Sequence, residues 1–142
     1  MSQDEFEHFL EAQEPVYAEV VAELTAGQER SHWMWFIFPQ LLGLGRSELA
    51  RRFALRSLDE ARRYVQHHEL GPSANAPGLV NAIPNRGISE IFGDPDDLKF
   101  HSSMTLFAAA SPGDSVFQAA LGKFFSGRND SQTIERLSTV SR

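Results

Sequence analysis

The sequence predicts an all-α fold, a single compact domain over residues 1–142 built around a buried helix that contains Trp-Met-Trp-Phe. Apolar residues recur at steps of three and four along several segments, as they do on one face of a helix. Residues typical of helix N-caps stand before most of these segments. A chain of this size buries about 68% of its unfolded surface, which is enough to enclose one core.

The N-terminal segment predicts an amphipathic helix that Gly27 ends. Ser2 and Glu5 have the spacing of a capping box, and apolar residues follow at helical steps as far as position 24. Pro15 interrupts this pattern, so we expect either a kink or two helices with Pro15 in the first turn of the second. Gln13 falls on the otherwise apolar face beside this break, where a buried polar group needs a partner.

Residues 33–38 are the most hydrophobic run and include both tryptophans of the chain. A continuous apolar run fits a buried strand or a short buried helix. We predict a helix, because the chain offers no comparable strand and an isolated strand would leave its backbone groups unpaired. Polar residues flank the run, at 30–32 and at Gln40. The segment is therefore either a core element with polar ends or one wall of a pocket.

Capping residues predict the helices in the middle of the chain. Ser47 begins a short helix to about Leu55, and Ser57 begins another that reaches His68. Residues 71–87 contain three prolines and three glycines, and predict one irregular loop with a helical turn or two at most, within 79–83. Residues 88–92 return the chain to the core as a short helix or turn.

The strongest helix start is the string Asp94-Pro95-Asp96-Asp97. It predicts Asp94 as the N-cap and Pro95 as the first residue of a helix that ends near Ala109. Another helix is predicted at about 115–125, capped by Asp114. A last helix begins at Asp130 or Ser131, and a polar tail follows at 139–142.

Composition excludes several classes of function. The chain has no cysteine, which excludes disulfides and thiolate catalysis. The formal net charge of -6 argues against a general nucleic-acid surface. The acidic N-terminus is unlike a signal peptide, and no apolar run approaches the length of about 18 residues that a membrane span needs. Nucleotide-binding and zinc motifs are absent as well, so we expect a cytoplasmic monomer without metal, cofactor or membrane contact.

Three stretches of sequence resemble a known family. They read Ser-His-Trp-Met-Trp-Phe-Ile-Phe-Pro-Gln (31–40), Ile-Phe-Gly-Asp-Pro-Asp-Asp-Leu-Lys-Phe (91–100) and Ser-Ser-Met-Thr-Leu-Phe-Ala (102–108). The family is a bacterial one, catalogued as domain of unknown function eighteen-ten and sometimes labelled calpastatin, and the resemblance covers nearly the whole chain. It implies a small, all-α, cytoplasmic protein with no established activity. The chain departs from the family pattern at residues 73–78, and at His101, where the family commonly has arginine.

Two polar clusters are candidates for chemistry. His32, beside Arg30, can exchange protons near neutral pH, while the arginine can hold a carboxylate or phosphate; alternatively, His32 bonds a carbonyl or a helix end. Lys99 shares a helical face with Ser102 and Ser103, which suits binding of a phosphate or hydroxyl group. The order of these residues differs from a catalytic Ser-x-x-Lys pair. Lys99 either receives an anion or pairs with Asp96 or with another carboxylate.

Two functions follow from these patterns. The first is binding, with hydrolysis or transfer in the case of an enzyme, of a small polar or phosphorylated metabolite in a cleft between the Trp33 segment and the segment 97–103. His32 is the candidate catalytic residue, and the candidate ligand-binding residues are Gln13, Arg30, Trp35, Gln40, Asp97, Lys99, Ser102 and Ser103. The second function is a noncatalytic module that docks a partner protein through the loop at 71–87.

Overall fold

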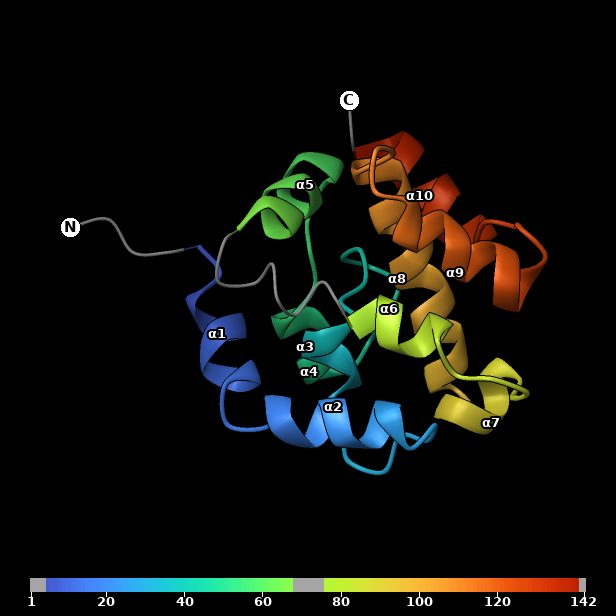
Figure 1. Cartoon of the computed structure of the whole chain (residues 1–142). Coiled ribbons are helices and arrows are strands. Elements are labelled where there is room, and N and C mark those ends of the chain that lie inside the picture. The colour runs from blue at the N-terminus through green and yellow to red at the C-terminus, as the bar shows by residue number, and fades with distance from the viewer. Residues whose placement is uncertain (1–4, 68–75, 141–142) are drawn as a thin grey trace.

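The computed structural model describes residues 5–67 and 76–140, and this part of the chain is helical, with no strand (Figure 1). An isolated parallel bridge joins Leu41 to Leu55. The predicted all-α fold in one compact domain is confirmed. The helices are α1 (Glu7–Gln13), α2 (Tyr17–Thr25), α3 (Met34–Ile37), α4 (Glu48–Arg52), α5 (Leu58–Gln66), α6 (Ala76–Asn81), α7 (Ile88–Phe92), α8 (Asp96–Ala110), α9 (Ser115–Phe125) and α10 (Ser131–Val140).

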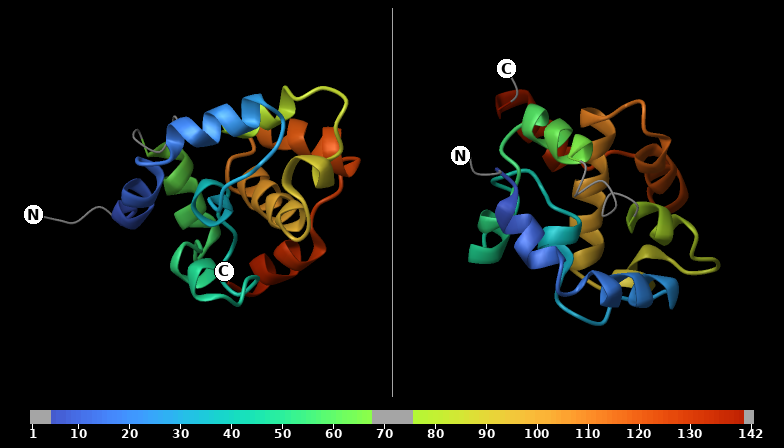
Figure 2. Two further views of the ribbon diagram at one scale, coloured as in Figure 1. Left: turned by 90° about the horizontal axis from the view of Figure 1, so that it is seen from below. Right: turned by 60° about the vertical axis from the view of Figure 1, so that its left-hand side comes forward.

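Helix α8 lies at the centre of the fold. Figure 2 (left) views it close to its axis, with the other helices arranged around it. It packs against α3, α5, α7, α9 and α10, and most of its side chains from Phe100 onward are buried. A helix that is covered on every side needs apolar side chains all round. After the charged first turn, the sequence of α8 supplies mostly apolar side chains, together with His101 and a few hydroxyl groups that must find partners inside the protein.

The aromatic run at 33–38 is part of the core, as predicted. Trp33 is 1% exposed and stands directly before α3, while Phe38 is buried directly after it. The ring centroids of Phe38 and Phe100 are 5.0 Å apart, with the rings at 88°. Such edge-to-face pairs contribute about 0.5–1.5 kcal/mol beyond the burial of their area. The short α3 helix is thereby fixed against the central helix.

The N-terminal break also follows the sequence. Pro15 separates α1 from α2, and α2 ends before Gly27, whose φ of 85° is in the left-handed region that favours glycine. Gln13 is buried at the end of α1. Its side-chain amide donates hydrogen bonds to the Phe36 carbonyl at 2.5 Å and to the Tyr64 hydroxyl at 2.8 Å. The polar group on the apolar face therefore joins α1 to α3 and α5.

Side-chain caps are found at three of the predicted helix starts. Ser47 and Ser57 accept hydrogen bonds from the backbone N–H groups three residues later, at 3.0 and 3.1 Å. Asp130 accepts from the N–H of Thr133 at 3.0 Å, and also from the Ser102 hydroxyl at 3.2 Å. The cap of α10 is thus bonded to the central helix.

The start of α8 differs from the prediction. The helix begins at Asp96 rather than Pro95, the peptide bond between Asp94 and Pro95 is cis, and no side chain caps the first turn. Instead, the N–H of Asp97 donates to the carbonyl of Gly93 at 2.8 Å. The end of α7 thus supplies the acceptor that the sequence assigns to Asp94. Asp94 itself is exposed.

Two further segments differ in detail. In the Pro/Gly-rich stretch 71–87, of which 71–75 lie outside the described residues, α6 begins already at Ala76, with Pro77 in its first turn. Asp114 stands at the N-cap position of α9, but its carboxylate accepts from the Ser111 hydroxyl at 2.6 Å instead of capping the helix. The helix α5 ends at Gln66, two residues before the predicted end at His68, because His67 is already extended. Ser2 of the predicted capping box lies outside the described residues, as does His68.

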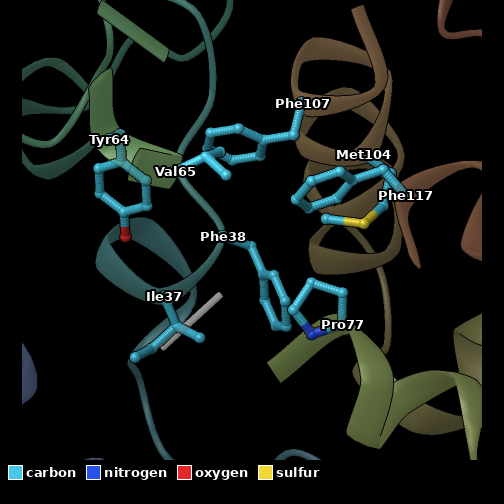
Figure 3. A pocket seen from close by; sticks show the side chains of 8 residues that line it. All are labelled: Ile37, Phe38, Tyr64, Val65, Pro77, Met104, Phe107 and Phe117. Atoms are coloured by element: carbon cyan, nitrogen blue, oxygen red, sulfur yellow. The ribbon is translucent and has the colours of Figure 1, made fainter. Parts of the chain in front are cut away.

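A small void lies between α3, α5, α6, α8 and α9 (Figure 3). Its volume is about 10 Å³, and apolar side chains make up almost all of its wall. A space of this size holds one water molecule at most. The Tyr64 hydroxyl, which Figure 3 shows at its edge, is already bonded to Gln13. This void is a packing defect of the core and not a ligand pocket.

None of the helices in the described residues is long and apolar enough to cross a membrane. The central helix, α8, has only 15 residues. A span of the hydrocarbon core takes about 20.

Truncation of the buried indole should destabilise the fold strongly. We expect Trp33→Ala to lower the free energy of unfolding by about 3–5 kcal/mol, because the substitution leaves a large cavity. Leu98→Ala is the control, since Leu98 is 59% exposed and belongs to the central helix. Chemical unfolding followed by circular dichroism measures both. Equal stabilities of the two variants would show that Trp33 is not part of the core.

Candidate ligand-binding site

The segment that leads from α2 to α3 is fixed by the carboxylate of Glu23. Its Oε1 accepts from the backbone N–H groups of Arg30 and Ser31, at 2.7 and 2.9 Å, and from the indole N–H of Trp33 at 3.0 Å. Its Oε2 accepts from the Ser31 hydroxyl at 2.7 Å. Burial raises the pKa of Glu23, but these bonds outweigh it and hold the pKa below the ordinary value. The connection is thereby held in one conformation.

Glu29, which lies in this connection, meets Asp96 at the start of α8. Burial raises the pKa of Glu29 to about 9, together with the hydrogen bond to Asp96 and the charge of that carboxylate. Two carboxyl groups can share a hydrogen bond only if one of them holds a proton. No N–H or O–H group of the described residues bonds to the buried Glu29 Oε2. A proton on Glu29 therefore removes the charge that this unpartnered oxygen would otherwise share.

Lys99 completes the group from one helical turn further along α8. Its ammonium lies 3.2 Å from Asp96 Oδ1 and 4.8 Å from the centre of the Trp35 ring. Spacing of three residues brings the two charges together on one face of the helix, and a cation over an indole face is attracted by the ring. The Lys99 and Asp96 side chains are mostly buried, with 22% and 24% of their surfaces exposed. We call Glu29, Trp35, Asp96 and Lys99 the Lys99 site.

Two polar atoms in this region, of which only the first belongs to the Lys99 site, lack a partner in the part of the chain that the structure describes. One is the indole nitrogen of Trp35, and the other is the hydroxyl of Ser103, whose residue is 0% exposed. Ser103 follows Lys99 by four residues, so both project from the same face of α8. A buried polar group without a partner costs about 1–3 kcal/mol. A ligand that bonds to these atoms would recover that cost.

From among the residues that the sequence predicts, the structure brings Trp35 and Lys99 together, and Ser103 lies one helical turn from Lys99 on the same face of α8. Asp97 is adjacent, but its carboxylate accepts from the N–H of Leu98 at 2.9 Å, and Asp96 is the acid that pairs with Lys99. The sequence leaves two roles open for Lys99, which are to bind an anion or to pair with a carboxylate such as Asp96. The structure shows the pairing with Asp96.

The other predicted residues are engaged or placed elsewhere. Gln13 bonds inside the core, and the Ser102 hydroxyl bonds to Asp130 and to the Leu98 carbonyl. Gln40 is half-buried beside Gly45. The side chains of Arg30 and His32 are exposed, and neither has a hydrogen bond or ion pair to another side chain within residues 5–67 and 76–140. The Arg30 and His32 side chains therefore form no hydrogen bond or ion pair with the residues of the Lys99 site.

Sequence reasoning missed Glu29. Glu29 stands two residues after Gly27, in a connection where a carboxyl group is usually exposed to solvent. The local sequence therefore does not identify it as a site residue. Asp96 does carry a signal, because its spacing from Lys99 is that of an ion pair on a helix. The contact between Glu29 and Asp96 joins positions 67 residues apart (96 − 29) and depends on the tertiary fold.

The chemistry available here is proton donation. Glu29 keeps its proton at neutral pH because its pKa is raised to about 9, and Asp96 lies beside the Lys99 ammonium. A carboxyl group that stays protonated beside other charged groups is a recurring feature of acid–base sites. In the described residues, no group of three or more histidines and acids is arranged to hold a metal ion.

The proton on Glu29 should be visible as a pH dependence of stability. Because its pKa is near 9 in the folded protein and 4.5 ordinarily, the folded state retains a proton that the unfolded state releases between these values. The free energy of unfolding should therefore fall as pH rises through this window. Glu29→Gln cannot titrate, so we expect a flatter profile and a stability above the parent at about pH 8.5, the alkaline end of that window.

Urea unfolding at several pH values tests this expectation. Glu19→Gln, an exposed carboxyl on α2, is the matched control and should follow the parent. A Glu29→Gln profile with the same slope as the parent would contradict a protonated Glu29.

The hydrogen bonds of Glu23 predict a second stability effect. Glu23→Ala removes one carboxylate and leaves two backbone N–H groups and an indole N–H without their acceptor. We expect a loss of about 3 kcal/mol, since hydrogen bonds to a charged group contribute about 1.5–3 kcal/mol. Glu19→Ala on the same helix should stay within about 0.5 kcal/mol of the parent. A similar, small loss in both variants would mean that the connection between α2 and α3 is held by packing alone.

Comparison with known proteins places the chain in a family. Residues 3–137 match the profile of the family described as "Protein of unknown function (DUF1810)". The crystal structure of the conserved hypothetical protein Rv1873 from Mycobacterium tuberculosis is similar, with 52% sequence identity, a TM-score of 0.92, and coverage of 94% of this chain and 96% of that one. No curated protein matches the chain. The chain therefore belongs to the DUF1810 family of proteins of unknown function.

Proposed function

We propose that this protein binds a small polar ligand at the Lys99 site, with Glu29 as the proton donor. The observation that carries the proposal is the raised pKa of Glu29, caused by burial and by its contact with Asp96. Groups whose pKa is shifted by burial and by a specific charged neighbour gather at functional sites. The unpartnered Trp35 nitrogen and Ser103 hydroxyl support the same location, because a ligand would satisfy them.

The charges favour a neutral polar ligand over a phosphorylated one. Asp96 already pairs with the Lys99 ammonium, and Glu23 lies near enough to raise the pKa of Glu29. A phosphate would have to compete with both carboxylates for one cation. A ligand that bears hydroxyl or amide groups can accept a proton or a hydrogen bond from Glu29 without that competition.

The same arrangement supports hydrolysis or group transfer as the further step. A carboxylic acid that stays protonated at neutral pH can give its proton to a leaving group. A water molecule or an acceptor hydroxyl forms the new bond as the bond to the leaving group breaks, the leaving group takes the Glu29 proton, and the proton of the attacking group returns to the Glu29 carboxylate. We propose this step for a ligand with a leaving oxygen or nitrogen.

The interaction-module alternative has less support. Among the described residues of the Pro/Gly-rich loop, 76–87, Leu79 is half-buried and Val80 and Ile83 are buried. A docking surface would instead expose apolar side chains together.

A ligand screen by thermal shift tests the proposal. Sugars, nucleosides, amides and their phosphorylated forms are compared on the parent and on Lys99→Met, Trp35→Phe and Glu29→Gln. A true ligand at a hundredfold excess over its Kd should stabilise the parent by about 2.7 kcal/mol. Each variant should lose most of this shift, while Glu19→Gln keeps it.

Two outcomes would contradict the proposal. One is that no compound of any class moves the melting temperature. The other is a ligand whose effect is unchanged in Lys99→Met and Glu29→Gln, because it then binds elsewhere. A stronger response to the phosphorylated compounds would instead show that the anion competes successfully with Asp96.

A further inference from the structure

A groove of about 450 Å³ lies between the C-terminal end of α2 and the end of α6. It shares no lining residue with the Lys99 site. Its volume is within the range of about 300–1,000 Å³ that is usual for small-molecule sites. The void of Figure 3, by contrast, is too small for a ligand. The groove is therefore the better-sized opening for a small molecule.

The walls of the groove are mostly apolar. Leu24 and Ile83 are buried, Leu79 is half-buried, and Pro84 extends the apolar surface toward solvent. The ammonium of Lys123, from α9, holds the α6 side in place: it donates to the carbonyls of Asn81 and Ile83 at 2.5 and 2.7 Å. One wall of the groove is thus fixed before any ligand binds.

Arg86 supplies a charge at the groove. Its side chain crosses Gly27 so closely that a Cβ added there would lie 3.3 Å from the Arg86 Nε. The φ of Gly27 is 85°, a conformation that favours glycine, and the Arg86 side chain would have to move by only a few tenths of an ångström to admit a Cβ. The guanidinium has neither an ion pair nor a hydrogen bond with any other described residue. This guanidinium is therefore free to bind an anion at the edge of the groove.

The end of α2 offers one explanation for this arginine. Its last turn carries no basic residue of its own, and a cation at a helix C-terminus contributes about 0.3–1 kcal/mol. That role needs no apolar groove beside the cation. The Arg86 guanidinium and the apolar groove beside it together fit a ligand that has an apolar body and one negative end. Guanidinium groups bind carboxylates through paired hydrogen bonds.

We propose that the groove between α2 and α6 binds a small organic acid, with its carboxylate on Arg86 and its apolar body against Leu79, Ile83 and Pro84. The site is separate from the Lys99 site, and it takes a different class of ligand. The groove would bind the ligand through one charged group, Arg86, and otherwise through its shape and its apolar walls.

Titration of the isotope-labelled full chain, followed by amide chemical shifts, tests the proposal. The probes are hexanoate, phenylacetate and the neutral amide hexanamide. Hexanoate or phenylacetate should shift amide signals in 24–27 and 79–86, and the better of the two reports whether the body is linear or aromatic. Arg86→Gln should weaken acid binding at least about tenfold, the loss expected for one charge-assisted contact of about 1.4 kcal/mol. Hexanamide should bind weakly, and equally to the parent and to this variant.

Lys99→Met is the control that separates the two sites, and it should bind hexanoate like the parent. The proposal is overturned if neither acid shifts the groove amides at about 10 mM, a concentration that reveals even millimolar affinities. It is also overturned if Arg86→Gln binds both acids as the parent does, or if Lys99→Met abolishes binding. A lower melting temperature of Arg86→Gln together with unchanged acid binding would assign Arg86 to the helix end alone.

Discussion

The burial of α8 on nearly all sides is the constraint on which the rest of the structure depends. A central helix cannot leave its polar side chains to water, so each hydroxyl must find a partner within the fold. Thr105 donates to the His101 carbonyl at 2.9 Å and accepts from the N–H of Asp130 at 2.8 Å, and Ser102 bonds to the Asp130 carboxylate. Ser103 is without such a partner in the described structure. This exception lies one helical turn from Lys99, on the same face of α8.

Features that depend on neighbours in sequence could be predicted. The caps at Ser47 and Ser57 are read from a spacing of three residues, and the break at Pro15 from the missing N–H of proline. The burial of Trp33 follows from an apolar run too long to remain in water. Each of these depends on local chemistry alone, which a single sequence displays. The start of α8 could not be predicted in this way. The first-turn N–H of Asp97 donates to the Gly93 carbonyl, which lies at the end of another helix.

The candidate site could be predicted only in part. Trp35, Lys99 and Ser103 are visible as unusual residues in apolar surroundings, and the pairing of Lys99 with Asp96 is visible as helical spacing. The proton on Glu29 is not visible, since an isolated glutamate is ionised at neutral pH. Its pKa depends on burial and on a carboxylate that the fold brings from far along the chain.

The two tryptophans, two positions apart in the chain, have unlike electrostatic surroundings. Trp33 is enclosed and its indole N–H bonds to the Glu23 carboxylate, whereas Trp35 is half-buried with the Lys99 ammonium over its ring. Indole emission responds to nearby charges. Light emitted by Trp35 should therefore change when the charge on Lys99 moves or the proton on Glu29 leaves. The fold contains its own optical reporter of this site.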